Sequence, residues 1–266
     1  MKALTVVLAE PPIRQVVKAA VRYLPCSVRT KDRWNAAHRP HYLAGVLYAA
    51  DQARRQGEEA ISVIEFGVAE GHGLLALEQH ALAVERATGI KIHVYGFDAS
   101  DGLPAGTGDY RDHTDQWQPG DYRMDVPALK ARLSWRTQLI LGDVASTVVS
   151  TSLLAPLGFV SFDLDYYSST VSALPILHRP HLRRVAIYFD YLSEHYNHRW
   201  AGELRAIEEF NAKQDGIKID RWRGLRTGRP FPEAPWIDAM YLAHDLDAIS
   251  VARLTRAPAQ MLPLPD

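Results

Sequence analysis

The stretch SVIEFGVAEGHG, residues 62–73, decides the fold that we predict. It begins with apolar residues typical of a buried strand and ends in three glycines, Gly67, Gly71 and Gly73, with Glu65 just before them. A glycine turn between a strand and a helix brings the backbone close to a ligand, and the helix N-terminus offers free N–H groups. The stretch therefore predicts the first strand and the ligand-binding turn of an α/β domain.

Apolar runs and helical stretches alternate along the chain from this point. The runs that we interpret as strands lie at 61–67, 91–98, 137–143, 158–165 and 184–190. Strands buried on both faces and separated by helices indicate a parallel sheet with right-handed crossovers. A last run at 238–245, with 221–225 before it, would close the sheet as an antiparallel pair. We therefore expect a Rossmann-like, doubly wound α/β fold with a mostly parallel, seven-stranded sheet and an antiparallel last strand.

The N-terminal part of the chain carries two helical patterns, at 13–24 and at about 41–56. We expect an N-terminal helical accessory segment over 1–57, a Rossmann-like domain over 58–256 and a flexible, proline-rich tail over 257–266. The first helix has an apolar stripe that can pack on its own domain or on a second subunit, so the sequence leaves a homodimer open.

Composition excludes several classes of protein. The 266 residues carry a net charge of −1, so no global field attracts nucleic acid or a membrane surface. No apolar run approaches the roughly 20 residues that a membrane span needs. The single cysteine, Cys26, excludes an internal disulfide and suits a reducing compartment. We expect a cytoplasmic protein whose partner is a small molecule.

Acidic residues mark the ends of the predicted strands. Asp98, Asp143, Asp165 and Asp190 each end a run, and Glu65 lies near the end of the first run. Ligands of open α/β sheets bind outside the carboxyl ends of the strands. Five acidic groups at one edge of a nearly neutral chain therefore predict a ligand site at that edge.

Two cofactors use a glycine turn after a first strand. Gly71, Gly73 and Ala76 spell the G-x-G-x-x-A pattern of a dinucleotide site, but Glu65 would direct a carboxylate towards the pyrophosphate. S-adenosylmethionine fits better, because its sulfonium and ammonium groups are cationic. Asp98 would accept hydrogen bonds from the ribose hydroxyls and Asp143 from the adenine amino group, while Glu65 or Asp163 would face the ammonium.

Five segments in this order also resemble a known family. They are E-x-G-x-x-x-G-x-G, then GFDASDGLP, LGD, FDLDYYSST and YFDY, within residues 60–212. This order is similar to the macrocin-type sugar O-methyltransferases, which are class I, S-adenosylmethionine-dependent enzymes with a Rossmann-like fold. The resemblance implies methyl transfer to a hydroxyl group of a sugar or another small natural-product-like molecule.

The same resemblance implies a magnesium ion beside the acceptor. Asp163 and Asp165 match the family's Asp-x-Asp pair, and Asp190 matches the second residue of its Asp-Asp-Tyr motif. Phe189 stands where that motif has its first aspartate, which leaves Asp165 and Asp190 as the expected ion ligands and leaves the ion itself open. Asp165 is the candidate general base. Without an ion, His195 and His198 become base candidates.

The loop over 105–125 is long for a connection between a strand and a helix. We expect it to form an acceptor wall with Tyr110, Trp117 and Tyr122, together with Tyr166 of the matched motif, because aromatic rings stack on sugar or ring faces. Two other functions remain open. The G-x-G-x-x-A pattern would suit an NAD-dependent oxidoreductase, and Phe189 would suit a non-catalytic binding or assembly protein.

Overall fold

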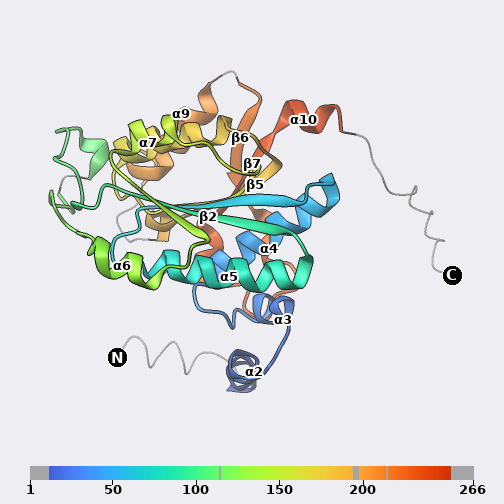
Figure 1. The fold of residues 1–266 in the computed structure, drawn as a ribbon. Coiled ribbons are helices and arrows are strands. Elements are labelled where there is room, and N and C mark those ends of the chain that lie inside the picture. Colours follow the sequence, from blue (N-terminus) through green and yellow to red (C-terminus); the bar gives the residue numbers. More distant parts are fainter. Residues whose placement is uncertain (1–11, 114, 194–197, 214, 253–266) are drawn as a thin grey trace.

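The structure of the chain is a computed structural model that describes residues 12–113, 115–193, 198–213 and 215–252. Figure 1 shows one mixed sheet with helices on both faces. None of the helices in the described part of the chain is long and apolar enough to cross a membrane.

The described residues form a seven-stranded sheet in the order β3-β2-β1-β4-β5-β7-β6. Strands β1 to β5 pair in parallel, and β7 pairs antiparallel with both β5 and β6. This topology confirms the predicted Rossmann-like fold. The strands are β1 (Ala60–Phe66), β2 (Lys91–Asp98), β3 (Thr137–Leu141), β4 (Leu157–Phe162), β5 (His181–Phe189), β6 (Ile217–Arg221) and β7 (Met240–Asp245).

The prediction of a strand over 221–225 is wrong. Strand β6 ends at Arg221, and residues 223–226 form a short 3-10 helix, η4 (Arg223–Arg226). The strand comes earlier because Ile217 and Ile219 alternate with polar residues and bury their side chains against the sheet, which is the period-two pattern of a strand.

Helices cover both faces of the sheet. Helices α4 and α5 lie on one face, and α7, α8 and α9 lie on the other (Figure 1). The helices are α2 (Pro12–Tyr23), α3 (Val28–Arg33), α4 (Pro40–Gln56), α5 (His72–Thr88), α6 (Val126–Arg132), α7 (Val144–Ser150), α8 (Tyr167–Ala173), α9 (Gly202–Ala212) and α10 (Leu246–Ser250). Four further 3-10 helices are η1 (Tyr110–Asp112), η2 (Leu174–His178), η3 (Asp190–Ser193) and η5 (Pro235–Ala239).

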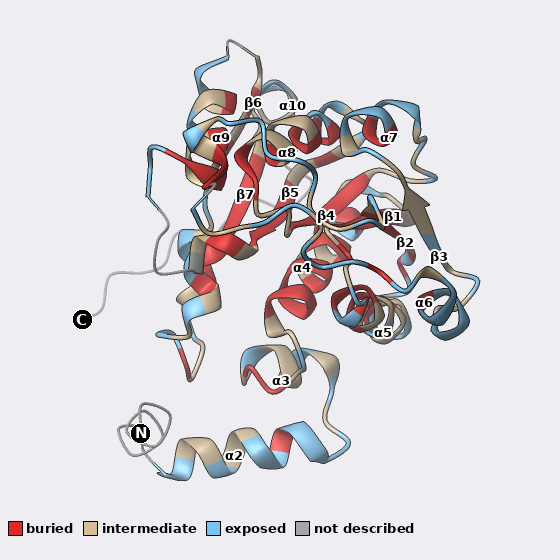
Figure 2. Cartoon of the chain, turned by 90° about the vertical axis from the view of Figure 1, so that its left-hand side faces the viewer, coloured by how far each residue is buried: buried red, intermediate tan, exposed pale blue. Residues whose placement is uncertain are grey.

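Helix α4 belongs to the core although it precedes the first strand. It packs against β4 and β5, and its buried residues include Tyr42, Val46 and Ala50. Figure 2 shows α4 and the strands as the buried centre, whereas α2 is largely exposed. The N-terminal segment therefore contains one helix that completes the sheet's cover and one that lies outside it.

Four phenylalanines stack side by side across the other face of the sheet. Phe97, Phe66, Phe162 and Phe189 come from β2, β1, β4 and β5, and neighbouring ring centroids lie 4.8 to 5.4 Å apart. Each is fully or almost fully buried. These rings fix the carboxyl ends of the four strands relative to one another, and the strand ends position the site.

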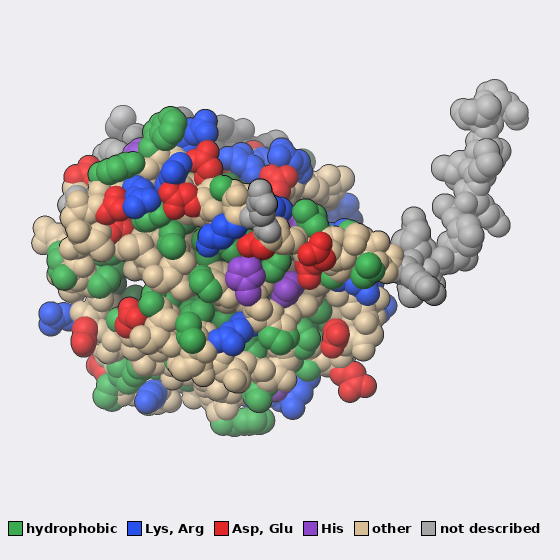
Figure 3. Space-filling model, turned by 90° about the horizontal axis from the view of Figure 1, so that it is seen from above, with side chains coloured by type: hydrophobic (Ala, Val, Ile, Leu, Met, Phe, Trp, Pro, Cys, Tyr) green, Lys and Arg blue, Asp and Glu red, His purple; other side chains and the backbone are tan. Residues whose placement is uncertain are grey.

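Charged side chains of both signs share the surface on the α9 side. Figure 3 views this side from above and shows basic and acidic groups interspersed. On α9, for example, Arg205 pairs with both Glu208 and Glu209. This face therefore lacks the single-sign field that nucleic acid or an anionic membrane would require.

Candidate active site

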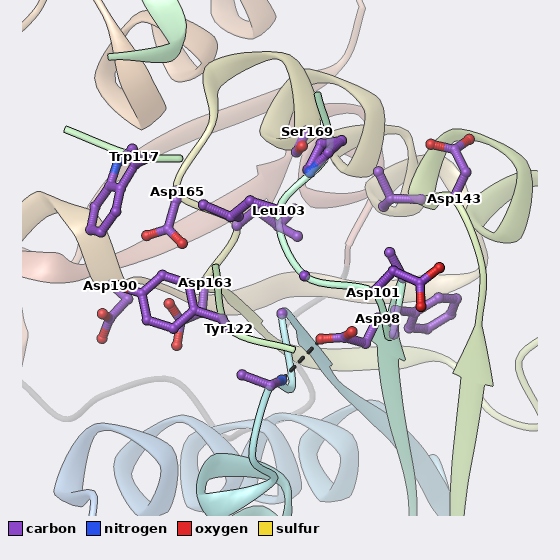
Figure 4. A pocket seen from close by; sticks show the side chains of 18 of the residues that line it. Asp98, Asp101, Leu103, Trp117, Tyr122, Asp143, Asp163, Asp165, Ser169 and Asp190 are labelled. Carbon is purple, nitrogen blue, oxygen red and sulfur yellow. Dashed lines mark hydrogen bonds between the residues drawn. The ribbon is translucent and has the colours of Figure 1, made fainter. Parts of the chain in front are cut away.

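One cavity of about 660 Å³ opens at the carboxyl ends of the parallel strands. Strand β1 pairs with β2 on one side and with β4 on the other. The order of the strands therefore reverses its direction between β1 and β4. Ligands of doubly wound sheets bind at such a switch point. Figure 4 shows the cavity with Asp98, Asp101 and Asp143 at one end, and Asp163, Asp165, Asp190, Trp117 and Tyr122 at the other.

The charge of this cavity has one sign. Its lining includes six aspartates, and none of the described residues that line it is lysine, arginine or histidine. The aspartates are Asp98, Asp101, Asp143, Asp163, Asp165 and Asp190. Five of them are predicted from the sequence, whereas Asp101, which lies within the quoted segment GFDASDGLP, was not predicted as a ligand.

Close packing in the fold leaves no room for a side chain at the three glycines of the first turn. A side chain at Gly67 would place its Cβ 1.6 Å from the carbonyl oxygen of Asp163, and the φ of Gly67 is +78°. At Gly71 a Cβ would meet Leu129, and at Gly73 it would lie 1.7 Å from a carboxylate oxygen of Glu65. Of the three, only Gly67 lines the cavity. The glycines let β1, β4 and α5 approach closely, and this packing shapes the cavity.

Glu65 lies behind the glycine turn rather than in the cavity lining. Its carboxylate accepts a 2.5 Å hydrogen bond from the hydroxyl group of Tyr42, on α4. Burial raises the pKa of Glu65 to about 8, against the lowering effects of the Tyr42 hydrogen bond and of Arg39. The second carboxylate oxygen is buried and has no hydrogen-bond partner among the described residues. Glu65 thus ties α4 to β1 beneath the N-terminus of α5.

Asp98 holds the glycine turn in place. Its carboxylate accepts hydrogen bonds from the backbone N–H groups of Val68 at 2.8 Å, Ala69 at 2.9 Å and Ser100 at 2.6 Å. A carboxylate has about four acceptor sites, so about one remains for a ligand hydroxyl. Asp98 can therefore bind one ribose hydroxyl while it fixes the loop that would cover the nucleoside.

Asp143 has two roles that are compatible. It caps helix α7 by accepting a hydrogen bond from the N–H group of Ser146 at 3.2 Å, and it lines the cavity from an exposed position. A cap and a ligand contact can share one carboxylate because each oxygen accepts more than one hydrogen bond. The side chain lies beside Asp101 at the same end of the cavity (Figure 4).

The opposite end of the cavity concentrates negative charge. Asp163 and Asp165 follow β4, and Asp190 follows β5. Burial first, and then the neighbouring Asp190 and Asp165, raise the pKa of Asp163 well above its usual range. Asp190 accepts a hydrogen bond from the hydroxyl group of Tyr188 at 2.8 Å. These three side chains would favour a cation in their midst.

Asp165 has left-handed backbone geometry, with a φ of +58°. Aspartate tolerates this region better than most residues, although it costs on the order of 1–3 kcal/mol. Other non-glycine residues with positive φ around this edge of the sheet are Arg39, Ala69, Ser100, His113 and Tyr122. Strained positions gather at functional sites, where the surrounding fold holds them in place.

Glu203 is an acidic neighbour that sequence analysis missed. It lies in the first turn of α9 and is 0% exposed. Burial, followed by Asp190 and Asp163, raises its pKa well above the usual range, while the nearby backbone of Leu192 acts in the opposite direction. No motif points to it, because only the folded chain brings α9 beside the ends of β4 and β5.

The residues at this end do not form a ready-made metal site. Phe189 stacks on Phe162 in the core, 5.0 Å between ring centroids, so an aspartate there would point into the aromatic stack instead of the cavity. The described residues contain no group of three or more histidine, cysteine, aspartate or glutamate side chains that could hold an ion. Magnesium held by Asp165 and Asp190 stays a prediction.

Aromatic side chains form a wall beside these aspartates. Trp117 meets the rings of Tyr122 and Tyr191 edge to face, with centroids 5.9 Å apart in both pairs, and all three residues line the cavity. Tyr191 was not predicted as a wall residue, because the family motif indicated a role for its acidic neighbour and none for the tyrosine. Two predicted wall residues lie elsewhere: Tyr110 is 71% exposed, and Tyr166 is buried outside the lining.

The loop that carries Trp117 is anchored to α8 and α9. The buried carboxylate of Asp112 accepts hydrogen bonds from the N–H and hydroxyl groups of Ser168, at the start of α8. Arg111 binds Tyr167 and Glu209. The wall is therefore held in position by the domain itself.

The two candidate histidine bases have weak geometric support. His198 is exposed and lies outside the cavity lining, with its ring 5.0 Å from that of His113. His195 lies outside the described residues. Among the predicted bases that the structure describes, Asp165 is the one that lines the cavity.

Several solved structures are similar to the chain. The O-methyltransferase NovP superposes with a TM-score of 0.53, at 14% identity over 87% of this chain and 95% of that one. The calicheamicin methyltransferase CalS11 is 21% identical over 87% of this chain and 90% of that one, with a TM-score of 0.49. The O-methyltransferase TomG from Streptomyces achromogenes, solved with S-adenosylmethionine, is 15% identical over 89% of this chain and 90% of that one, with a TM-score of 0.43.

No family model and no curated protein matches the sequence. The similarity to NovP at low identity establishes the architecture: seven strands in the observed order, with helices on both faces. The chain has the Rossmann-like methyltransferase fold. Its chemistry has to be argued from the cavity, because one fold hosts many functions.

Proposed function

We propose that the chain is an S-adenosylmethionine-dependent O-methyltransferase that acts on a hydroxyl group of a sugar or another small natural-product-like molecule. The observation that carries this proposal is the six-aspartate lining of a cavity at the switch point of a methyltransferase fold. S-adenosylmethionine brings a sulfonium and an ammonium group to these carboxylates. The pyrophosphate of NAD would bring negative charge to the same place, which argues against an oxidoreductase.

The two ends of the cavity suggest how the substrates lie. Asp98, Asp101 and Asp143 would hold the nucleoside, and Asp163 would face the charged end of the methionine part. The acceptor would lie against Trp117 and Tyr122. Close positioning of the two reactants is the main contribution that the protein makes to an in-line displacement.

The chemical step then needs a group that takes one proton. The acceptor oxygen attacks the methyl carbon, the new C–O bond forms as the C–S bond breaks, and the sulfonium becomes the neutral sulfur of S-adenosylhomocysteine. The hydroxyl proton passes to Asp165, the candidate base in the cavity lining. Magnesium held by Asp165 and Asp190 stays a prediction, and no step is assigned to it.

The test is calorimetric titration with S-adenosylhomocysteine, with NAD as the control ligand. We expect stoichiometric binding of S-adenosylhomocysteine at micromolar affinity and no binding of NAD. Replacement of Asp98 by asparagine should weaken binding at least tenfold, or about 1.4 kcal/mol, because an amide offers fewer acceptor sites to the glycine turn and the ribose. Asp220→Asn, an exposed position on β6, is the matched control.

Two results would contradict the proposal. Folded protein that binds NAD in place of S-adenosylhomocysteine would support an oxidoreductase. Folded protein that binds neither ligand would support a non-catalytic binding or assembly protein. Three expectations stay predictions: the domain boundaries at 57 and 257, the homodimer and the cytoplasmic location. Within 1–57, helix α4 packs on the sheet. The tail over 257–266 lies outside the described residues.

A further inference from the structure

At the acceptor end of the cavity, the described lining residues include several carboxyl groups and no basic side chain. Three aspartates, Asp163, Asp165 and Asp190, line that end, and Asp98, Asp101 and Asp143 line the other. S-adenosylmethionine carries a single net positive charge. The second substrate therefore enters a field that favours positive charge.

The aromatic wall at the same end also suits a cation. Trp117 is the best type of side chain for a cation–π contact, and it lies edge to face with Tyr122 and Tyr191. Figure 4 shows Trp117 and Tyr122 at the same end of the cavity as Asp163 and Asp165. An aromatic face combined with nearby carboxylates is the usual way in which proteins recognise an ammonium group.

The wall is preorganised for such a ligand. The hydroxyl group of Tyr191 donates a hydrogen bond to the side chain of Gln116, which in turn contacts the ring nitrogen of His113. Residue 114 lies outside the described part of the chain. Before it in the sequence, Asp112 holds the loop to α8 by accepting a hydrogen bond from the N–H group of Ser168. A ring plane held in place loses little entropy when a ligand stacks on it.

We propose that the acceptor is a hydroxylated amine, for example an amino sugar, whose ammonium group binds between Asp165, Asp190 and the face of Trp117. This proposal rests on the proposed methyltransferase function and narrows its substrate class. The ammonium would place a neighbouring hydroxyl group beside the methyl donor. A sugar linked to a nucleoside diphosphate is disfavoured, because its phosphates would enter a cavity lined by six aspartates.

Arg39 does not supply an alternative phosphate site. It lies at the N-terminus of α4, outside the cavity lining, with its guanidinium 5.5 Å from the centre of the Tyr42 ring. Its charge acts on Glu65, Asp163 and Asp190 from behind the cavity. Arg39 therefore offsets part of the buried negative charge, and it leaves the cavity itself acidic.

The experiment uses the full chain saturated with S-adenosylhomocysteine and compares three probes by calorimetry. The probes are glucosamine, N-acetylglucosamine and thymidine diphosphate glucose, which share a hexose ring and differ in charge. Each is titrated with EDTA and again with magnesium. We expect glucosamine to bind at least tenfold more tightly than the neutral sugar, and the nucleotide sugar not to bind in either buffer.

Two variants locate the site. Trp117→Leu and Asp165→Asn should each weaken glucosamine binding at least fivefold while S-adenosylhomocysteine binding stays intact. The exposed Asp220→Asn should change neither. S-adenosylhomocysteine binding is measured first. If the parent protein does not bind it, the methyltransferase proposal fails, and the result says nothing about whether the acceptor is an amine.

The proposal is overturned if the neutral sugar binds as tightly as the amine. It is also overturned if the nucleotide sugar binds when magnesium is added, because an ion would then offset the aspartates in place of the acceptor. In both cases the methyltransferase function would stand, provided that S-adenosylhomocysteine binds.

Discussion

The two ends of the cavity hold their carboxylates in different ways. At the cofactor end, Asp98 accepts three backbone hydrogen bonds and Asp143 caps a helix. At the acceptor end, burial and then the neighbouring Asp190 and Asp165 raise the pKa of Asp163, and burial followed by Asp190 and Asp163 raises the pKa of Glu203. The first end is stabilised by the fold alone, whereas the second would be stabilised further by a positively charged ligand. The two ends thus differ in the cause that dominates the environment of their carboxylates: backbone hydrogen bonds at one end, and burial among other carboxyl groups at the other.

The largest effect that we predict is at the acceptor end. Asp165→Asn should lower kcat by about 10²- to 10⁴-fold, because the amide cannot take the hydroxyl proton. The affinity for S-adenosylhomocysteine should change less than threefold, since Asp165 lies away from the nucleoside end. Single-turnover measurements with a methyl-labelled donor would check this. Unchanged kcat would assign the base to another group.

Gly73→Ala probes the support behind the cofactor end. The new Cβ would lie 1.7 Å from a carboxylate oxygen of Glu65, which is itself held by Tyr42. We expect a loss of about 1–3 kcal/mol in the free energy of unfolding, as for other overpacked cores. Urea denaturation would measure it. Gly224→Ala is the matched control, because a Cβ there meets nothing within 4 Å and its stability should stay within about 0.5 kcal/mol of the parent.

A smaller effect should appear in the pH dependence of stability. The pKa of Glu65 is about 8 in the folded chain, against an ordinary value of 4.5. Protonated Glu65 therefore favours the folded state, and its contribution is full below pH 4.5 and is lost as the pH rises through about 8. The slope from this one group is at most about 1.4 kcal/mol per pH unit.

Glu65→Gln should remove this part of the slope, because glutamine stays neutral throughout. Thermal or urea unfolding of both proteins at several pH values between 5 and 8 would check it, with the exposed Glu70→Gln as the control. If the stability of the variant falls with pH as steeply as that of the parent, Glu65 is ionised in the folded chain and does not contribute to the slope.

Several features of the fold could be predicted from the sequence. Apolar runs that are buried on both faces, with helices between them, specify a parallel sheet, and the first five strands lie close to where they were expected. Helix α7 was missed because its seven residues, VASTVVS, are mostly β-branched or serine, and propensity alone does not mark such a segment as helical. The cap by Asp143 and packing against the sheet stabilise it.

The candidate site was only partly predictable. Strand ends share one edge of a parallel sheet, so the aspartates that end strands could be placed together from the sequence. Glu65, Gly71 and Gly73 were expected at the cofactor; they lie outside the cavity lining, and their role there stays a prediction. Glu203 and Tyr191 carried no separate signal, since their approach to the cavity depends on how α9 and η3 pack.

The sequence by itself determined the sheet, the edge at which the cavity opens and the acidic residues that line it, because all three follow from local patterns and from the period of strands and helices. Only the tertiary structure decided which carboxylates face the cavity and which are buried behind it. That choice depends on side-chain direction at strand ends and on contacts between residues far apart in the chain, such as Tyr42 with Glu65 and Asp112 with Ser168. Phe189 is the clearest case: its position in the sequence suggests a missing ion ligand, and its place in the aromatic stack shows that the core required an apolar ring there.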